Sequence, residues 1–347
     1  MVFVPPRRVL VLRFSSLGDI VLTSAAIAAL KTAWPQTEIV FAVKAAFADL
    51  VRANPNIAQV IAVEPGEGAF AMARKLSAVN ADALLDLHRN NRTKLLHLLV
   101  RGPKKRVVWS KRPFLDNVAV RLRLRPYRAA MTISERYHLA AEQLAEQALP
   151  RGEMKLWVSA AHQAEADAAL AAAGVDLARP IAALSPGGTA FTKLWPIERF
   201  AELGARIAAT GAQVVVTGSK GEGALAKTIL AAAAGAKDLT GKFGIGVLGG
   251  VLTRSAVFAG NDSGPMHMSR ALGTPSLAIF GSTDPRQFEF TGHAVMFAGV
   301  SCSPCSFFGR ASCPEGHFRC MLDLDVDRAW AMLSPLLGGR RALPVHG

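Results

Sequence analysis

Residues 256–285 read AVFAGNDSGPMHMSRALGTPSLAIFGSTDP. The apolar run at 256–259 enters a polar turn, and the apolar spacing that begins at Met266 predicts a helix. A second apolar run, 275–280, ends in another polar turn. A strand, a turn, a helix and a second strand in this order are typical of the parallel sheet of an α/β protein. Both polar turns would lie at the carboxyl edge of that sheet, where such proteins bind ligands.

The turn before the predicted helix suits an anion. Asn261, Asp262 and Ser263 can cap the helix, and Pro265 fits its first turn. The N–H groups of residues 264–267 would then direct partial positive charge into the turn. The pattern therefore predicts a phosphate site, although a capped helix between two buried strands, with no ligand, explains it equally well.

Length and composition indicate two cytoplasmic α/β domains. The chain has 347 residues, of which 51% are hydrophobic. No uninterrupted apolar run reaches the roughly 18 residues expected of a transmembrane helix. Arg7 and Arg8 precede only a short apolar run that ends at Arg13, a pattern unlike a secretory signal.

The formal net charge of +14 is concentrated in the first half of the chain. Residues 1–150 carry 22 Lys and Arg against 11 acids, and residues 89–128 carry 13 against the single acid Asp116. A solvated face is the usual explanation of a charge run. A span this one-sided would nevertheless repel itself without an anionic partner, such as nucleic acid, a membrane surface or a phosphorylated substrate. Few aromatic side chains accompany these cations, which disfavours nucleic acid.

Polar turns also follow two predicted strands of the first half. The strand at 9–12 leads into a turn that contains Asp19, at the start of a helix that runs to about residue 33. An acid there can simply oppose the helix dipole. The strand at 83–87 is followed by a polar turn that begins near Arg89 and continues through Asn90, Arg92 and Lys94. The residues of this turn either contact a ligand or are ordinary solvated residues.

Two turns of the second half have ligand-binding features. Ser185-Pro-Gly-Gly-Thr189 follows a strand, its glycines allow close approach of a ligand, and Lys193 adds a positive charge. Glu222 follows the next strand, at the position where doubly wound folds keep an acid for ribose hydroxyls.

All four cysteines lie between residues 302 and 320, together with His317. A reducing cytosol disfavours disulfides. Four thiolates could form a tetrahedral structural zinc or iron site, but the spacing fits no standard zinc finger, and free, partly buried cysteines remain the alternative. The candidate ligands are Cys302, Cys305, Cys313 and Cys320.

Taken together, these motifs resemble the lipopolysaccharide heptosyltransferases of glycosyltransferase family 9. The likeness lies in FSSLGDI at 14–20, in the turn at 185–189 with Lys193 before Trp-Pro, and in NDSGPMH, ALGTP and FGSTDP within 261–285. It implies the GT-B architecture, an α/β fold of two Rossmann-like domains that face each other across a cleft. Residues 1–153 would bind the acceptor and 154–324 the nucleotide sugar, with a cysteine-rich loop at 301–321. A final helix within 325–347 would cross back toward the first domain.

The resemblance also implies a reaction. An inverting glycosyltransferase would move heptose from an ADP-sugar, ADP-L-glycero-D-manno-heptose, to the anionic inner core of lipopolysaccharide. It would work at the cytoplasmic face of the inner membrane of a Gram-negative bacterium, in peripheral contact with that membrane and without nucleic acid. No cofactor would be needed for catalysis.

Roles follow from the same resemblance. Asp19 would be the general base and Lys193 a second catalytic residue. The implied donor-binding residues are Ser185, Gly187, Gly188, Thr189, Glu222, Asp262, Ser263, Gly264, Met266 and His267. The implied acceptor-binding residues are Ser16, Gly18, Arg89, Arg92 and Lys94. His267 could equally well serve as a packing residue.

Three other functions fit parts of the sequence. A GT-B glycosyltransferase or an epimerase that uses another nucleotide sugar would share the two-domain architecture. A non-catalytic polyanion-binding protein would share the basic first half. The joint presence of Asp19 and Lys193 argues against the non-catalytic alternative.

Overall fold

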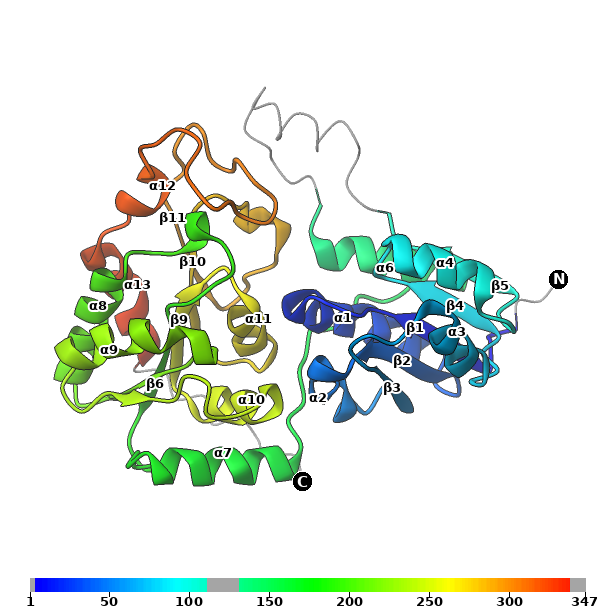
Figure 1. Cartoon of the computed structure of the whole chain (residues 1–347), viewed down its shortest axis with the longest axis horizontal. Coiled ribbons are helices and arrows are strands. Elements are labelled where there is room, and N and C mark those ends of the chain that lie inside the picture. Colours follow the sequence, from blue (N-terminus) through cyan, green and yellow to red (C-terminus); the bar gives the residue numbers. More distant parts are fainter. Residues whose placement is uncertain (1–3, 111–130, 338–347) are drawn as a thin grey trace. The chain divides into compact units, whose positions relative to one another are not determined.

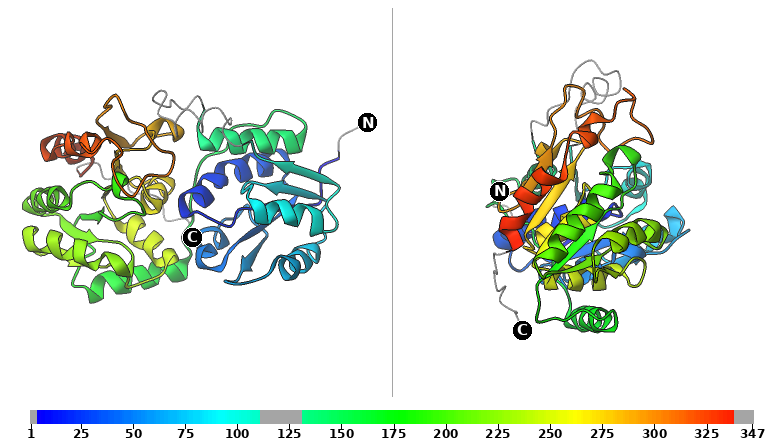
Figure 2. Two further views of the ribbon diagram at one scale, coloured as in Figure 1. Left: turned by 45° about the horizontal axis from the view of Figure 1, so that its top comes forward. Right: turned by 90° about the vertical axis from the view of Figure 1, so that its left-hand side faces the viewer.

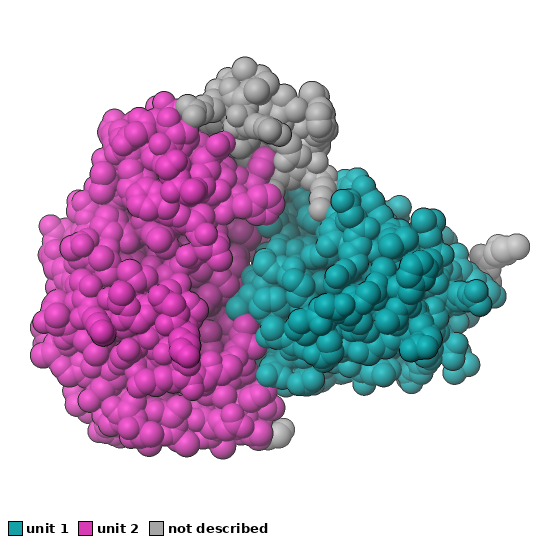
Figure 3. Space-filling view, in the orientation of Figure 1, with its two compact units in different colours: residues 1–113, 130–158 teal, residues 114–129, 159–347 magenta. Residues whose placement is uncertain are grey.

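The computed structural model describes residues 4–110 and 131–337. Contacts divide this part of the chain into a first unit, residues 4–110 with 131–158, and a second unit, residues 159–337. Figure 3 shows the two units in different colours. The predicted cysteine-rich loop and the final helix both belong to the second unit. Residues 111–128, somewhat less than half of the predicted basic span, lie outside the described residues.

The first unit is built on a parallel sheet with the strand order β3-β2-β1-β4-β5 (Figure 1). Its strands are β1 (Arg8–Leu12), β2 (Glu38–Lys44), β3 (Gln59–Val63), β4 (Ala83–Asp86) and β5 (Lys105–Val108). Its helices are α1 (Leu17–Ala33), η1 (Ala45–Phe47), α2 (Asp49–Arg52), α3 (Ala69–Ser77), α4 (Asn91–Leu99) and α6 (Ile133–Ala145). The continuous apolar run of β1 is typical of a central parallel strand, and residues 9–12 are fully buried.

The second unit contains a parallel sheet with the order β11-β10-β9-β6-β7-β8. Its strands are β6 (Ile181–Ser185), β7 (Gln213–Val216), β8 (Lys237–Asp238), β9 (Val257–Asn261), β10 (Ser276–Phe280) and β11 (Ala294–Phe297). Its helices are α7 (Ala160–Ala172), η2 (Phe191–Lys193), α8 (Ile197–Ala209), η3 (Lys220–Glu222), α9 (Gly223–Ala232), α10 (Ile245–Arg254), α11 (Gly264–Ala271), η4 (Pro285–Gln287), α12 (Arg319–Leu322) and α13 (Val326–Leu337). The predicted strand, turn, helix and strand of residues 256–285 are β9, α11 and β10.

The order of strands reverses once in each sheet. The chain builds β1, β2 and β3 outward in one direction and then returns to place β4 on the other side of β1. In the second sheet, β9 returns to the other side of β6 in the same way. Open α/β sheets bind ligands outside the carboxyl ends of the strands at such a reversal. The topology therefore marks the β1/β4 and β6/β9 edges as the places to search for sites.

The segment after α6 stays with the first unit. Contacts assign the chain to the first unit as far as Val158. The Lys155 N–H donates to Ser24 Oγ of α1 at 3.1 Å, and Leu156 is buried. Hydrogen bonding and burial hold this segment on α1, and neither is visible in local composition.

The last described helix, α13, packs within the second unit. It lies against α8, β9, β10 and β11, and Figures 1 and 2 show it in red beside the green α8. Val326, Ala329 and Leu333 join the apolar core of that unit. Its predicted crossing toward the first domain stays a prediction. Among the described helices, none combines the length and the apolar character that a membrane span requires.

Candidate active site

The carboxylate of Asp19 is held by a group of donors in the first unit. Arg13 Nη2 lies 2.5 Å from Asp19 Oδ2, and Ser16 Oγ donates to the same oxygen at 2.6 Å. The hydroxyl of Tyr137, on α6, donates to Oδ1 at 3.4 Å. The local sequence explains the first contacts, because Ser16 precedes α1 and Asp19 is its third residue, as in a capping box. The side chain of Asp19 keeps 26% of its surface exposed.

Arg13 is itself fixed in place. It is buried just beyond the end of β1, and its Nη1 donates to the carbonyl of Leu87 at 2.5 Å. Its guanidinium carbon lies 5.7 Å from the centre of the Tyr137 ring, a cation–π contact. The result is an oriented, charge-compensated and partly exposed carboxylate, which can accept a proton from a bound hydroxyl.

The predicted acceptor residues are spread over the first unit. Gly18 is buried in the first turn of α1. Arg92 and Lys94 lie exposed in the first turns of α4, which Asn90 caps by accepting from the Thr93 N–H at 2.9 Å. Arg89 turns toward β5, where its Nη1 donates to the carbonyl of Trp109 at 3.4 Å.

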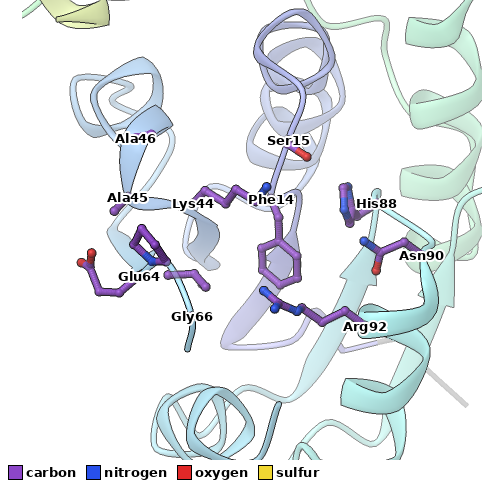
Figure 4. A pocket seen from close by; sticks show the side chains of 12 residues that line it. Phe14, Ser15, Lys44, Ala45, Ala46, Glu64, Gly66, His88, Asn90 and Arg92 are labelled. Carbon is purple, nitrogen blue, oxygen red and sulfur yellow. The ribbon is translucent and has the colours of Figure 1, made fainter. Parts of the chain in front are cut away.

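A cavity of about 380 Å³ opens at the carboxyl edge of the first sheet (Figure 4). Its walls come from the segments that follow β1, β2, β3 and β4. They are Phe14, Ser15, Lys44, Ala45, Ala46, Val63, Glu64, Pro65, Gly66, His88, Asn90 and Arg92. Of the predicted acceptor residues, the lining includes Arg92. It also includes Lys44 and His88, which the motifs did not single out.

In the second unit, Lys193 and Asp262 form a buried ion pair. Lys193 Nζ lies 2.8 Å from Asp262 Oδ2, and Thr283 Oγ1 donates to the same oxygen at 2.7 Å. His267 Nε2 is 3.9 Å from Oδ1. Burial raises the pKa of Asp262, but the charges of Lys193 and His267 and the hydrogen bonds to Lys193 and Thr283 outweigh it and leave the pKa below its ordinary value. Lys193 thus explains how a carboxylate can lie beside a predicted phosphate site.

Asn261 and Ser263, which were expected to cap α11, do not form side-chain cap hydrogen bonds within the described chain. Asn261 ends β9 and is fully buried, with its Oδ1 accepting from the Trp195 N–H at 3.0 Å and its Nδ2 donating to the carbonyl of Pro186 at 2.7 Å. It therefore links two neighbouring turns rather than capping the helix. Ser263 is the residue that precedes α11, and its hydroxyl oxygen is buried without a hydrogen-bond partner among the described residues.

Two further donor-site predictions concern buried side chains. The side chain of Met266 is fully buried. A ligand at the start of α11 could therefore contact only the backbone of this residue. The ring of His267 packs edge-on against Phe288 with centroids 4.5 Å apart, and its Nδ1 lies 3.4 Å from Arg270 Nη1. His267 has the packing role that the sequence left open, in addition to its position beside Asp262.

Glu222 joins the turns that follow β6 and β7. Its Oε1 accepts from the Gly188 N–H at 3.0 Å, and its Oε2 accepts from the Ser219 N–H at 2.6 Å. A Cβ atom on Gly187 would lie 1.9 Å from Glu222 Oε1. A side chain at 187 would therefore displace the carboxylate of Glu222. Of the other predicted donor residues in this turn, Ser185 is buried and Thr189 is exposed.

The cysteines do not form the predicted metal site. Within residues 4–110 and 131–337, no group of three or more His, Cys, Asp or Glu side chains is placed to hold a metal ion. Cys302 Sγ lies 3.7 Å from His317 Nε2, and all four cysteines are free. Cys320 instead packs into the apolar core, where burial, together with the nearby cysteines, raises its pKa to about 12. The alternative of free, partly buried cysteines is the one that the structure supports.

A model of glycosyltransferase family 9 (heptosyltransferase) matches residues 69–317. The chain belongs to glycosyltransferase family 9. Family 9 membership confirms the predicted family and, at the level of a glycosyltransferase, the predicted enzyme class. The match includes Lys193, Glu222 and Asp262.

Individual relatives agree with this family 9 assignment. Lipopolysaccharide heptosyltransferase 2 of Escherichia coli strain K12 is 28% identical over 167 residues, which cover 46% of this chain and 47% of the relative. The chain spans half or less of the length of the curated relatives it matches.

Two solved structures share the fold of this family 9 chain. A family 9 glycosyltransferase of Veillonella parvula has a TM-score of 0.78 at 21% identity, with 95% of this chain and 97% of that chain covered. The ADP-heptose lipopolysaccharide heptosyltransferase II of E. coli has a TM-score of 0.74 at 21% identity, with 95% and 98% covered. The predicted fold class, two Rossmann-like α/β domains of the GT-B type, is confirmed.

Sequence reasoning missed several residues of the candidate site. Arg13 and Tyr137 hold Asp19, and Thr283 contacts Asp262. A charged residue directly after a buried strand was the available signal for Arg13. Tyr137 lies far from Asp19 in sequence, and no pattern in the chain pointed to it.

Proposed function

We propose that this family 9 member transfers heptose from ADP-L-glycero-D-manno-heptose to the anionic inner core of lipopolysaccharide. The observation that carries the proposal is the cluster at the β6/β9 edge, where Lys193 lies beside Asp262 just before the start of α11. The chain that contains this cluster belongs to a heptosyltransferase family. This edge is the ligand-binding reversal of the second sheet.

The donor site uses backbone groups and one cation. The first N–H groups of α11 and the ammonium of Lys193 stabilise the charge that ADP gains as it leaves. Asp262 holds Lys193 at this edge, and its carboxylate oxygens also accept hydrogen bonds from hydroxyls of the sugar. The turn at 185–189 and Glu222 border the nucleotide, with Glu222 toward the ribose. Protein groups alone supply this stabilisation.

Asp19 acts on the acceptor. An acceptor hydroxyl attacks the anomeric carbon in a single displacement, which inverts that centre, and Asp19 takes the hydroxyl proton. The donors from Arg13, Ser16 and Tyr137 fix the direction in which the carboxylate presents its oxygens. The cations of the first unit attract an acceptor that carries carboxylates and phosphates. This chemistry suits an enzyme in peripheral contact with the cytoplasmic face of the inner membrane.

A transfer assay tests the proposal. The purified chain is incubated with ADP-heptose and a lipopolysaccharide acceptor that lacks heptose, and the products are analysed by mass spectrometry and by NMR of the anomeric proton. We expect one added heptose with inverted configuration and one ADP released per transfer. Turnover of ADP-heptose to an isomer without acceptor would instead identify an epimerase. Transfer from UDP-N-acetylglucosamine but not from ADP-heptose would refute the proposed donor.

A further inference from the structure

The cysteine-rich loop, residues 301–321, packs on the short helix η2. The ring of Phe191 stacks on the ring of Phe318, with centroids 4.7 Å apart. The Thr192 N–H donates to the carbonyl of Arg310 at 3.1 Å, and the Arg310 N–H donates back to Thr192 Oγ1 at 2.7 Å. Although 118 positions separate these last two residues in the chain, they are joined by a reciprocal pair of hydrogen bonds.

The third contact of the loop is with the stem of Lys193, the last residue of η2. Gly309 lies so close to this stem that a Cβ atom on it would be 2.8 Å from Lys193 Cδ and 2.9 Å from Lys193 Cγ. At the other end of the side chain, the ammonium is paired with Asp262. The side chain is therefore held along its stem by the backbone of Gly309 and at its charge by a carboxylate.

The loop is itself anchored to the polar turn that follows β10. The Cys305 and Ser306 N–H groups both donate to the carbonyl of Ser282 at 3.0 Å. The hydroxyl of Ser282 lies 2.8 Å from Thr192 Oγ1, and both of these side chains are buried. Buried hydroxyls depend on such partners. The turn after β10, the cysteine-rich loop and η2 thus form one hydrogen-bonded unit around the residue that precedes Lys193.

A fixed stem is an advantage for a lysine that binds an anion. The side chain of lysine is flexible, and it loses rotamer freedom when its charge is held against a ligand. Contacts that restrict the side chain before the ligand arrives reduce this entropic cost. A charge that is already in place also stabilises a departing anion without reorganisation of the site.

We propose that the cysteine-rich loop is a positioning element of the donor site, in which Gly309 and Arg310 set the direction of the Lys193 ammonium. Gly309 confines the stem, and Arg310 fixes the preceding residue, Thr192. Both act through Lys193, so that they are positioning residues and not catalytic ones. This role belongs to the backbone of the loop and does not depend on its thiols. The inference rests on the proposed function, which assigns Lys193 to the phosphates of ADP.

Gly309→Ala tests the contact with the stem. The new methyl group should displace Lys193 and reduce ADP affinity by about tenfold, the lower end of the range for a lost charged hydrogen bond. Affinity for adenosine, which has no phosphate, should not change. Gly316→Ala is the matched control in the same loop, with a φ of +72° against +88° at Gly309. Both substitutions strain the backbone, but a Cβ at 316 would meet nothing within 4 Å among the described residues.

Acylation measures the position of Lys193 directly, without a nucleotide. The side chain of Lys193 is 13% exposed, and the exposed Lys227 serves as an internal reference. An N-hydroxysuccinimide ester of acetic acid should acylate Lys193 several-fold faster, relative to Lys227, in Gly309→Ala than in the unaltered protein or in Gly316→Ala. Peptide mass spectrometry follows the reaction.

Thr192→Val gives an independent test of the second contact, because it removes the hydroxyl that accepts from the Arg310 N–H. It should lower ADP affinity and expose Lys193 to acylation in the same way as Gly309→Ala. Thr192→Ser keeps the hydroxyl and should restore both properties. Equal behaviour of the two Thr192 variants would reject the role of Arg310.

The outcomes separate this inference from the proposed function. Equal losses of ADP affinity in Gly309→Ala and Gly316→Ala, or unchanged acylation of Lys193 in Gly309→Ala, would overturn the positioning role. So would a further loss of affinity when Gly309→Ala is added to Lys193→Ala, because a residue that acts through Lys193 has no effect once Lys193 is absent. Normal ADP affinity in Lys193→Ala, together with faster acylation in Gly309→Ala, would reject the donor role of Lys193 and retain its positioning by the loop.

Discussion

The ammonium of Lys193 and the carboxylate of Asp262 form an ion pair in the second unit, with 2.8 Å between Nζ and Oδ2 and side-chain exposures of 13% and 6%. The pair has two separable effects. The Lys193 charge serves the proposed phosphate site, and it also compensates a carboxylate that would otherwise be buried alone. A substitution at either residue must therefore be judged by both stability and ligand affinity.

Lys193→Ala should weaken both properties. Loss of a charged hydrogen bond should reduce ADP affinity by about 1.5–3 kcal/mol. The unpaired Asp262 should lower the free energy of unfolding by about 3–5 kcal/mol. The double variant Lys193→Ala/Asp262→Asn should recover much of the stability but not the affinity. Calorimetry with ADP and denaturant unfolding distinguish the two effects, and unchanged ADP affinity in Lys193→Ala would remove this residue from the donor site.

Asp19→Asn should remove the proposed base with little change in shape. Because a general base typically contributes about 10²–10⁴-fold, kcat for heptose transfer should fall by that factor. ADP affinity should stay the same, since the nucleotide is assigned to the other unit. Asp49→Asn, which alters an acid on α2 that pairs with Arg52, is the matched control. Near-normal kcat in Asp19→Asn would mean that another group takes the proton.

Tyr137→Phe should have a smaller effect on the same step. It removes the hydroxyl that donates to Asp19 Oδ1 but keeps the ring beneath Arg13. A typical hydrogen bond is worth about 0.5–1.5 kcal/mol, and this one to the carboxylate is long at 3.4 Å, so kcat should decrease roughly 2- to 12-fold. Steady-state kinetics would check this, with the acceptor KM expected to change little. The same substitution made in the Asp19→Asn background should have little further effect if Tyr137 acts through Asp19.

Gly187→Ala should disrupt the turn after β6. Its new Cβ would lie 1.9 Å from Glu222 Oε1, which displaces the carboxylate from the Gly188 N–H. We expect at least a tenfold loss of ADP affinity. Gly187→Ala/Glu222→Ala should regain part of it, because the clash is relieved. Gly221→Ala, where a Cβ meets nothing within 4 Å, is the control, and an equal loss there would show that the effect is unspecific.

The thiols should differ in reactivity. The thiolate is the reactive form, and the raised pKa of about 12 for Cys320 means that almost none is present at pH 8. Iodoacetamide should therefore label Cys320 last in the native protein, as followed by mass spectrometry of peptides. Four thiols should react after denaturation. About one zinc or iron per chain in the protein as purified would contradict the cysteine arrangement described above.

The sequence predicted the sheets better than the side-chain contacts. Buried parallel strands such as β1 are continuous apolar runs, and polar turns mark their carboxyl ends, so local patterns were sufficient. The contacts of Tyr137 with Asp19 and of Lys193 with Asp262 were not predictable, because the two residues of each pair come from distant parts of the chain. Spacing also failed to show that Cys320 packs into the apolar core.

Asn261 illustrates a related difficulty. A residue before a predicted helix is a natural cap candidate, yet this side chain is enclosed by two turns that the sequence does not place beside it. The segment that follows α6 is a similar case, since Lys155 is held by a hydrogen bond to Ser24 of α1 that local composition does not show. In each case a tertiary contact determines the position of the residue, and the local sequence pattern is compatible with more than one position.

The two hydrogen bonds of Glu222 have a consequence for how donor preference could change. Because one carboxylate holds the turns after both β6 and β7, those turns are mechanically coupled. A substitution at 222 that altered contacts with the nucleoside would also move the Gly188 N–H. If these turns hold the donor as proposed, its nucleoside and phosphate contacts would have to evolve together, through paired changes at 187 and 222 rather than single steps.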